Sequence, residues 1–208
     1  MKEIKRKGNF HALNQKAIAR LYAKENNTEY EDLKLIVAHL GGGMSIGVHK
    51  YGLVVDTTDG DEEGPFTPDR TGILPNKPLI DMCFSGKYTC EEMKKKVSGK
   101  GGLVGYLGTN DVVEVLEMSK TNDEAKLVMD AMIYQISKDI CSMSAVLCGE
   151  VDAILITGGI AYSDYVTGEI EKRVGHIAKV KVYPGERELE ALAEGVVRVL
   201  EGGELKRL

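Results

Sequence analysis

Two predicted strands that each run into a cluster of glycines constrain the fold of this chain more than any other feature. Residues 33–40 (LKLIVAHL) and 151–157 (VDAILIT) are continuous apolar runs, which is typical of strands covered on both faces. Glycines follow at 41–43 and at 158–159. Glycine makes up 24 of the 208 residues, or about 12 %, whereas its share in average proteins is about 7 %. Because glycine allows tight turns and close approach of the backbone to a ligand, these two turns carry most of the functional information.

The other elements predict an α/β fold. Apolar spacing indicates a helix over 11–25, and tight turns join the strand at 33–40 to strands at 44–50 and 53–57. Four of the five prolines lie in a long loop over 58–78. The elements predicted after that loop are helices over 78–85, 89–97, 111–119 and 122–148, a strand over 151–157, a helix to about 174, a strand over 179–184 and a helix over 187–201.

A meander of three antiparallel strands followed by a βαβα unit implies a mixed sheet with helices on both faces, within one domain. Regular secondary structure is expected to be interrupted between 99 and 111, at GKGG and LGTND. A capping-box pattern at Thr121–Glu124 is expected to begin the longest helix.

Composition excludes several classes of function. A net charge of -5, from 27 basic and 32 acidic residues, disfavours nonspecific nucleic-acid binding. The apolar runs are far shorter than the roughly 20 residues of a membrane span, and no signal peptide opens the sequence. The four cysteines form no CxxC pair, so the sequence does not predict a zinc site. Free thiols in a reducing cytosol are predicted instead. We therefore expect a cytoplasmic protein without nucleic-acid or membrane partners.

The first glycine turn is a candidate anion site. The three glycines at 41–43 bring backbone N–H groups within reach of an anion, and Ser45 adds a hydroxyl. His39 ends the preceding strand. The alternative is a plain glycine hairpin with a histidine in the core.

The second glycine turn links a strand to a helix. Gly158 and Gly159 leave the strand so that the helix N-terminus points at whatever occupies the site, an arrangement that suits a phosphate or nucleotide. A valine at 158 is expected to block that approach. The sequence matches neither GxGxxG nor a P-loop, so a structural turn is the alternative.

A third candidate is Arg70, within EGPFTPDRTG at 63–72. A guanidinium in a proline-bracketed loop can clamp a phosphoryl group with two hydrogen bonds. The alternative is a surface salt bridge to Asp69 or Glu63.

Taken together, these features resemble the half-domain of the actin-like ATPases (ribonuclease H-like fold) and of sugar and acetate kinases. More closely, the chain resembles the carboxy-terminal portion of the butyrate kinases, in the acetokinase family. HLGGG favours this branch, because acetate kinases typically carry HLGNG. The motifs that carry the resemblance are FHALNQKAIAR, IVAHLGGGMSIGVHKYG, EGPFTPDRTG, CFSGKYTCEEMKKK, GKGGLVGYLGTND, ILITGGIA and VYPGE with ELEALAEG.

The resemblance implies ATP-dependent phosphoryl transfer to a short-chain carboxylate (butanoate + ATP = butanoyl phosphate + ADP) with Mg²⁺. It implies that Arg70 and His11 are catalytic. It places the nucleotide and its phosphates on His39, Gly41, Gly42, Gly43, Ser45, Asp111, Thr157, Gly158, Gly159 and Ile160. One of Glu186 and Glu188 matches the magnesium-associated glutamate, and Arg187 between them leaves both as candidates.

The resemblance also implies an amino-terminal domain with part of the acyl site, to which no segment of this sequence corresponds. We therefore expect residues 1–208 to form one carboxy-terminal domain with a core over about 26–186, and helices 11–25 and 187–201 to contact the absent domain. The expected partners are a nucleotide, a short-chain fatty acid, and either a complementary amino-terminal chain or a second copy. The alternative functions are an inactive nucleotide-binding module or a fragment that acts through protein association.

Overall fold

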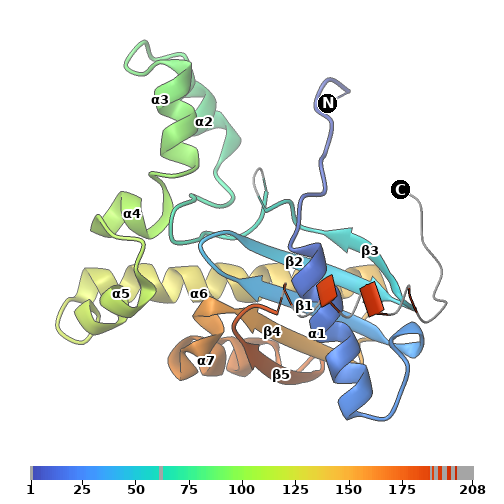
Figure 1. Cartoon of the computed structure of the whole chain (residues 1–208). Helices are drawn as coiled ribbons and strands as arrows, with labels where there is room; N and C mark the ends of the chain where they lie inside the picture. The colour runs from blue at the N-terminus through green and yellow to red at the C-terminus, as the bar shows by residue number, and fades with distance from the viewer. Residues whose placement is uncertain are drawn as a thin grey trace.

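One five-stranded mixed sheet organises the computed structural model, which describes residues 2–60 and 63–187 together with 189, 192–193, 196–197 and 200 (Figure 1). The strand order is β3-β2-β1-β4-β5. The predicted α/β architecture of a meander followed by a parallel unit is therefore confirmed. The strands are β1 (Lys34–Leu40), β2 (Met44–Lys50), β3 (Leu53–Thr57), β4 (Ala153–Gly158) and β5 (Lys179–Pro184).

The sheet register brings the two glycine turns together. Strands β1 and β2 pair antiparallel, with His39 opposite Ser45. Strands β1 and β4 pair in parallel, with His39 opposite Thr157. The carboxyl ends of the two central strands therefore meet at one edge, where open α/β sheets commonly bind their ligands.

Helices cover both faces of the sheet (Figure 1). On one face, α1 packs Ile18 and Tyr22 against Leu35 and Leu155 of the central strands. The prediction that α1 also contacts a further domain stays a prediction. The helices are α1 (Ala12–Glu25), α2 (Asn76–Cys83), α3 (Cys90–Val97), α4 (Gly102–Leu107), α5 (Val112–Met118), α6 (Asp123–Ser144) and α7 (Asp164–Val174), with short 3-10 helices η1 (Tyr30–Asp32), η2 (Ala145–Leu147) and η3 (Gly159–Tyr162).

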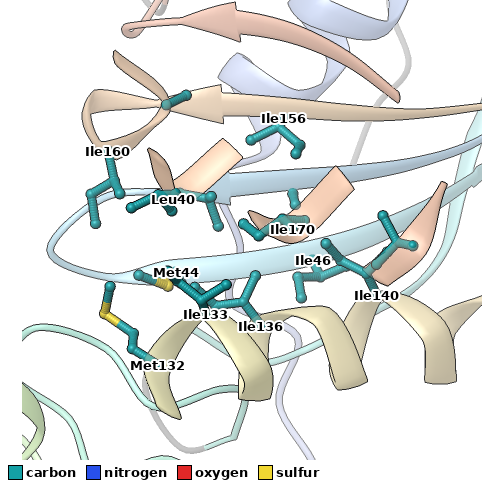
Figure 2. Close-up of a cluster of buried hydrophobic side chains, with 14 of the residues drawn as sticks. Leu40, Met44, Ile46, Met132, Ile133, Ile136, Ile140, Ile156, Ile160 and Ile170 are labelled. Carbon is teal, nitrogen blue, oxygen red and sulfur yellow. The ribbon is translucent and has the colours of Figure 1, made fainter. Parts of the chain in front are cut away.

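The larger core lies on the opposite face, between the sheet and helices α6 and α7. Figure 2 shows Ile133, Ile136 and Ile140 of α6 facing Met44 and Ile46 of β2. These side chains are almost completely buried. Helical spacing along α6 places its apolar residues on one side, and the strong bias of β1, β2 and β4 towards apolar residues follows from their central place.

Three local predictions were wrong. Helix α4 lies within the stretch predicted to be a break, because N–H groups of Leu103 and Val104 bond to carbonyls of the Arg70 loop. The segment after β4 forms η3 first, and Ser163 then caps a separate α7. Asn122, and not Thr121, caps α6, accepting from the N–H groups of residues 124 and 125.

No helix among the described residues is both long enough and apolar enough to cross a lipid bilayer.

Candidate functional site

A cavity of about 510 Å³ lies where the glycine turns meet. Six of the residues predicted from the sequence line it, namely Gly41, Gly42, Asp111, Gly159, Ile160 and Glu186. They come from four separate parts of the chain. The register of β1 against β4 brings the two glycine turns together, Asp111 immediately precedes α5, and the segment after β5 supplies Glu186.

An apolar wall completes the cavity. Val112, Val113 and Leu116 of α5 form part of it, and Tyr162 of η3 is 72 % exposed beside them. An apolar wall with a few polar groups is typical of small-molecule pockets. Sequence reasoning missed these side chains, although their nearness to Asp111 and Gly159 in the chain was a usable signal. The remaining lining residues are Pro68, Asn110 and Ser163.

Asp111 has a structural role beside its place in the cavity. Its Oδ1 accepts hydrogen bonds from the backbone N–H groups of Val113 (2.8 Å) and Glu114 (3.3 Å), which caps α5. This cap fixes the direction of the carboxylate and holds the apolar wall in place.

The two glycines after β4 have different roles. Gly158 has φ +94°, and a Cβ there would overlap the carbonyl oxygen of Leu40, so this glycine permits β4 to lie beside β1. A Cβ at Gly159 would meet nothing within 4 Å, and this residue lines the cavity. The expected reason for the effect of a valine at 158 was therefore wrong. Thr157, also predicted to bind nucleotide, is fully buried and donates its hydroxyl to Gly185 O (3.1 Å).

This difference predicts opposite outcomes for two valine variants. We expect Gly159→Val to fold normally and to bind nucleotide more weakly, because its side chain enters the cavity. Gly158→Val should instead lower the free energy of unfolding by about 3 kcal/mol or more, through strain and overlap. Urea denaturation and calorimetric titration with Mg-ADP separate the two effects. Gly168→Val on α7, which also has open space, is the matched control. Equal affinities of Gly159→Val and the control would contradict the assignment.

His39 is buried against this cavity. Its ring is 1 % exposed, Nδ1 lies 3.1 Å from Asn14 Oδ1, and Nε2 lies 3.5 Å from Glu186 Oε1 without a hydrogen bond. Burial, with a smaller contribution from His11, lowers the pKa of His39 to about 3. His39 is therefore neutral near pH 7, and its contact with Glu186 is not an ion pair. Because the amide oxygen of Asn14 can only accept, Nδ1 carries the proton of this neutral ring. Nε2 is then a buried acceptor without a hydrogen bond, which a ligand hydroxyl or N–H group could satisfy.

His11 lies directly on His39. The ring centroids are 3.8 Å apart and the planes differ by 10°. His11 Nδ1 is 2.8 Å from the hydroxyl oxygen of Ser45. Ser45 was expected to present its hydroxyl to a ligand, but its side chain is fully buried and contacts His11 and Gln15 instead.

Arg70 lies against the first glycine turn and outside the lining of the cavity. A Cβ built at Gly43 would be 3.3 Å from Nη1 of Arg70, so a glycine there lets the guanidinium come close. Glu63, one of the expected salt-bridge partners, pairs with Arg6 at 3.0 Å, and Asp69 approaches Arg70 only to 3.8 Å. The geometry places this cation beside the first glycine turn, which suits charge stabilisation at that turn.

The magnesium prediction has one carboxylate to support it. Glu186 lines the cavity, whereas Glu188 lies outside the described residues. Within the described part of the chain, no group of three His, Cys, Asp or Glu side chains could hold a metal ion. Mg²⁺ usually takes one or two carboxylates together with nucleotide phosphates and water, so a single glutamate fits such an ion.

Comparison with known proteins gives a consistent result. The family model described as "Acetokinase family" matches residues 2–180. The chain is 53 % identical over 204 residues to butyrate kinase 2 of Clostridium acetobutylicum, covering 97 % of this chain and 57 % of that protein. It is 52 % identical over 195 residues to a probable butyrate kinase of Bacteroides thetaiotaomicron, covering 93 % of this chain and 55 % of that protein. The chain thus spans little more than half the length of these relatives.

Solved structures show the same fold. The structure of Porphyromonas gingivalis acetate kinase superposes with a TM-score of 0.82 at 20 % identity, covering 91 % of this chain and 55 % of that one. A propionate kinase from Francisella tularensis superposes with a TM-score of 0.78 at 22 % identity, covering 87 % and 53 %. The fold is therefore that of one half of these kinases, as the sequence predicted.

Proposed function

Because the chain belongs to the acetokinase family, we propose that it is the nucleotide-binding part of a butyrate kinase, which transfers a phosphoryl group between ATP and butanoate to give butanoyl phosphate and ADP. The observation that carries this proposal is the convergence of both glycine turns, Asp111 and Glu186 on one cavity, with Arg70 and His11 at its margin. The names of the relatives support butanoate as the acceptor.

Different residues of the chain bind the nucleotide and assist phosphoryl transfer in this proposal. The apolar wall and Asp111 hold the adenosine, and the backbone at Gly42 and Gly159 lies close to the phosphates, since neither position has a neighbouring atom where a Cβ would stand. Arg70 neutralises charge that develops on the transferring phosphoryl group, and His11 donates a hydrogen bond to it. Glu186 would hold Mg²⁺, which would supply positive charge next to the nucleotide phosphates.

Binding of the acyl acceptor and closure of the site require a further protein domain in this proposal. Described residues of the last segment, among them Leu189 (84 % exposed), Leu192 (50 %) and Val196 (60 %), leave apolar side chains in water. We propose that this segment and α1 contact either a separate chain that corresponds to the amino-terminal portion of the longer relatives or a second copy of this chain. Such closure would exclude water from the transferring phosphoryl group.

Titration of the purified chain with Mg-ADP tests the proposal first. The expected result is saturable binding in the micromolar to low millimolar range, with heat that is lost in Gly159→Val. Adding the amino-terminal portion of a butyrate kinase, butanoate and ATP should then produce butanoyl phosphate. Binding without transfer in that mixture would favour an inactive nucleotide-binding module, and absence of binding would contradict the proposal.

A further inference from the structure

A line of buried polar side chains lies between α1 and strands β1 and β2, where an apolar core would be expected. Gln15, Ser45 and His49 are fully buried and Tyr30 is 3 % exposed. Burying polar groups is unfavourable unless each finds a hydrogen-bond partner. Hydrogen bonds link these four residues in a series that runs from Tyr30 to His49, Gln15 and Ser45. Ser45 in turn lies within hydrogen-bond distance of His11. We call the four residues the Tyr30–Ser45 relay.

The direction of each bond in the relay is determined by Gln15. Its Nε2 lies 3.2 Å from the backbone carbonyl oxygen of Ser45, which can only accept, so the amide nitrogen must face that oxygen. The amide oxygen then faces His49 Nε2 at 3.2 Å, and that nitrogen must carry the proton. Burial, with smaller contributions from Lys16 and Arg20, lowers the pKa of His49 to about 3, so the ring is neutral. His49 Nδ1 therefore accepts from the Tyr30 hydroxyl at 2.7 Å.

The hydrogen bonds of the Ser45 hydroxyl determine whether Nδ1 of His11 donates or accepts. The hydroxyl oxygen of Ser45 accepts from Gln15 Nε2 at 3.0 Å and from the backbone N–H of His11 at 3.2 Å. Both of its lone pairs are then used, and its one hydrogen is left for the remaining contact, His11 Nδ1 at 2.8 Å. Nδ1 of His11 is consequently an acceptor.

We propose that Gln15 and Ser45, the last two members of the Tyr30–Ser45 relay, are positioning residues that hold His11 as a neutral imidazole with its proton on Nε2. A cationic His11 would direct a third N–H at the Ser45 oxygen and lose the hydroxyl hydrogen bond. In the proposed phosphoryl transfer, on which this consequence rests, His11 then acts as a hydrogen-bond donor through Nε2, and Arg70 supplies the positive charge.

A glycine in the middle of β2 supports the relay independently. Gly47 has no side chain to pack in the strand, a position where glycine is usually unfavourable. A Cβ there would overlap Oε1 of Gln15 and stand 3.4 Å from His49 Nε2. The space that this glycine leaves in the strand is the space that the relay occupies.

Nitrogen-15 NMR of the imidazole rings tests the proposed protonation state of His11 without an activity assay. The chain has four histidines, so the ring signals can be assigned with single variants. Near neutral pH, His11 should show an unprotonated Nδ1 and a protonated Nε2. In Gln15→Met and in Ser45→Ala, states with Nδ1 protonated should become populated. Tyr30→Phe is the matched control at the far end of the relay and should leave His11 unchanged. A protonated Nδ1 of His11 in the unaltered chain would overturn the proposal, whether or not the variants fold.

A transfer assay separates this inference from the proposed function. A glutamine amide reaches the place of Nε2, whereas an asparagine amide reaches only that of Nδ1. With the amino-terminal portion of a butyrate kinase present, His11→Gln should retain about tenfold more transfer than His11→Asn, as expected for one hydrogen bond to a charged oxygen. A wild-type rate in both variants, together with the predicted NMR signals, would support the relay and contradict the role of His11 in transfer.

Discussion

Replacing Arg70 with alanine is expected to lower phosphoryl transfer by about 10³ or more while leaving nucleotide affinity nearly unchanged. Arg70 lies at the Gly43 turn and does not line the cavity, so it contributes little to binding of the nucleotide itself. Its loop is held rigidly, since Thr67 Oγ1 accepts from the Arg70 N–H at 3.1 Å and Asp69 O accepts from the N–H groups of Gly99 and Gly101. A cation held in place before reaction needs no reorganisation in the transition state, which makes its removal costly.

The rate is measured in a mixture of this chain, the amino-terminal portion of a butyrate kinase, ATP and butanoate, and affinity by calorimetry with Mg-ADP. Arg70→Lys should recover only part of the loss, because lysine keeps the charge without the two-pronged geometry. Arg173→Ala, which removes a surface arginine paired with Glu169 at 2.7 Å, is the control. An equal fall in affinity and rate for Arg70→Ala would show that this residue binds the nucleotide and has no special role in the transition state.

Acidification is expected to unfold the chain through its buried histidines. Burial holds the pKa values of His39 and His49 at about 3, against about 6.5 in the unfolded chain. Between these values the unfolded state binds more protons, so stability is complete above about pH 6.5 and falls as the pH decreases towards 3. Each histidine contributes a slope of up to about 1.4 kcal/mol per pH unit. Two units of acidification would then remove about 5 kcal/mol, which is a large part of the stability of an ordinary domain.

Urea denaturation at a series of pH values measures this slope. His49→Gln should be less stable near neutral pH, since it loses bonds to Gln15 and Tyr30, and its stability should fall less steeply with acid by about 1.4 kcal/mol per pH unit. His176→Gln, at an exposed position, should reproduce the unaltered slope. If His49→Gln and His176→Gln had the same slope, the buried ring would not be the cause.

The sheet could be predicted because its signals are local. Continuous apolar runs at β1 and β4, the alternation of β2 and the glycine turns each act within a few residues. Short connections account for the antiparallel pairing of β1 with β2 and of β2 with β3, whereas no local signal places β4 beside β1. Helix α4 was missed because its N–H groups bond to carbonyls of Thr67 and Pro68, which are distant in the chain and leave no local pattern.

The candidate site was predicted in its parts and not in their relation. Local glycine signals found both turns, but Gly158 and Gly159 looked equivalent in sequence. They differ because the carbonyl of Leu40, from another strand, lies against only one of them. Ser45 likewise looked like a ligand for an anion, and only the packing of α1 on β2 showed that Gln15 and His11 occupy its hydroxyl.

By itself, the sequence determined the elements, their order and the family, since these depend on residue type and spacing along the chain. The tertiary structure alone decided which side chains meet. The register of β1 against β4 joins the glycine turns, and the packing of α1 stacks His11 on His39 and sets the direction of the relay. Hydrogen bonds act over about 3 Å, so their partners are fixed by the fold, and His11 and Ser45 are 34 positions apart.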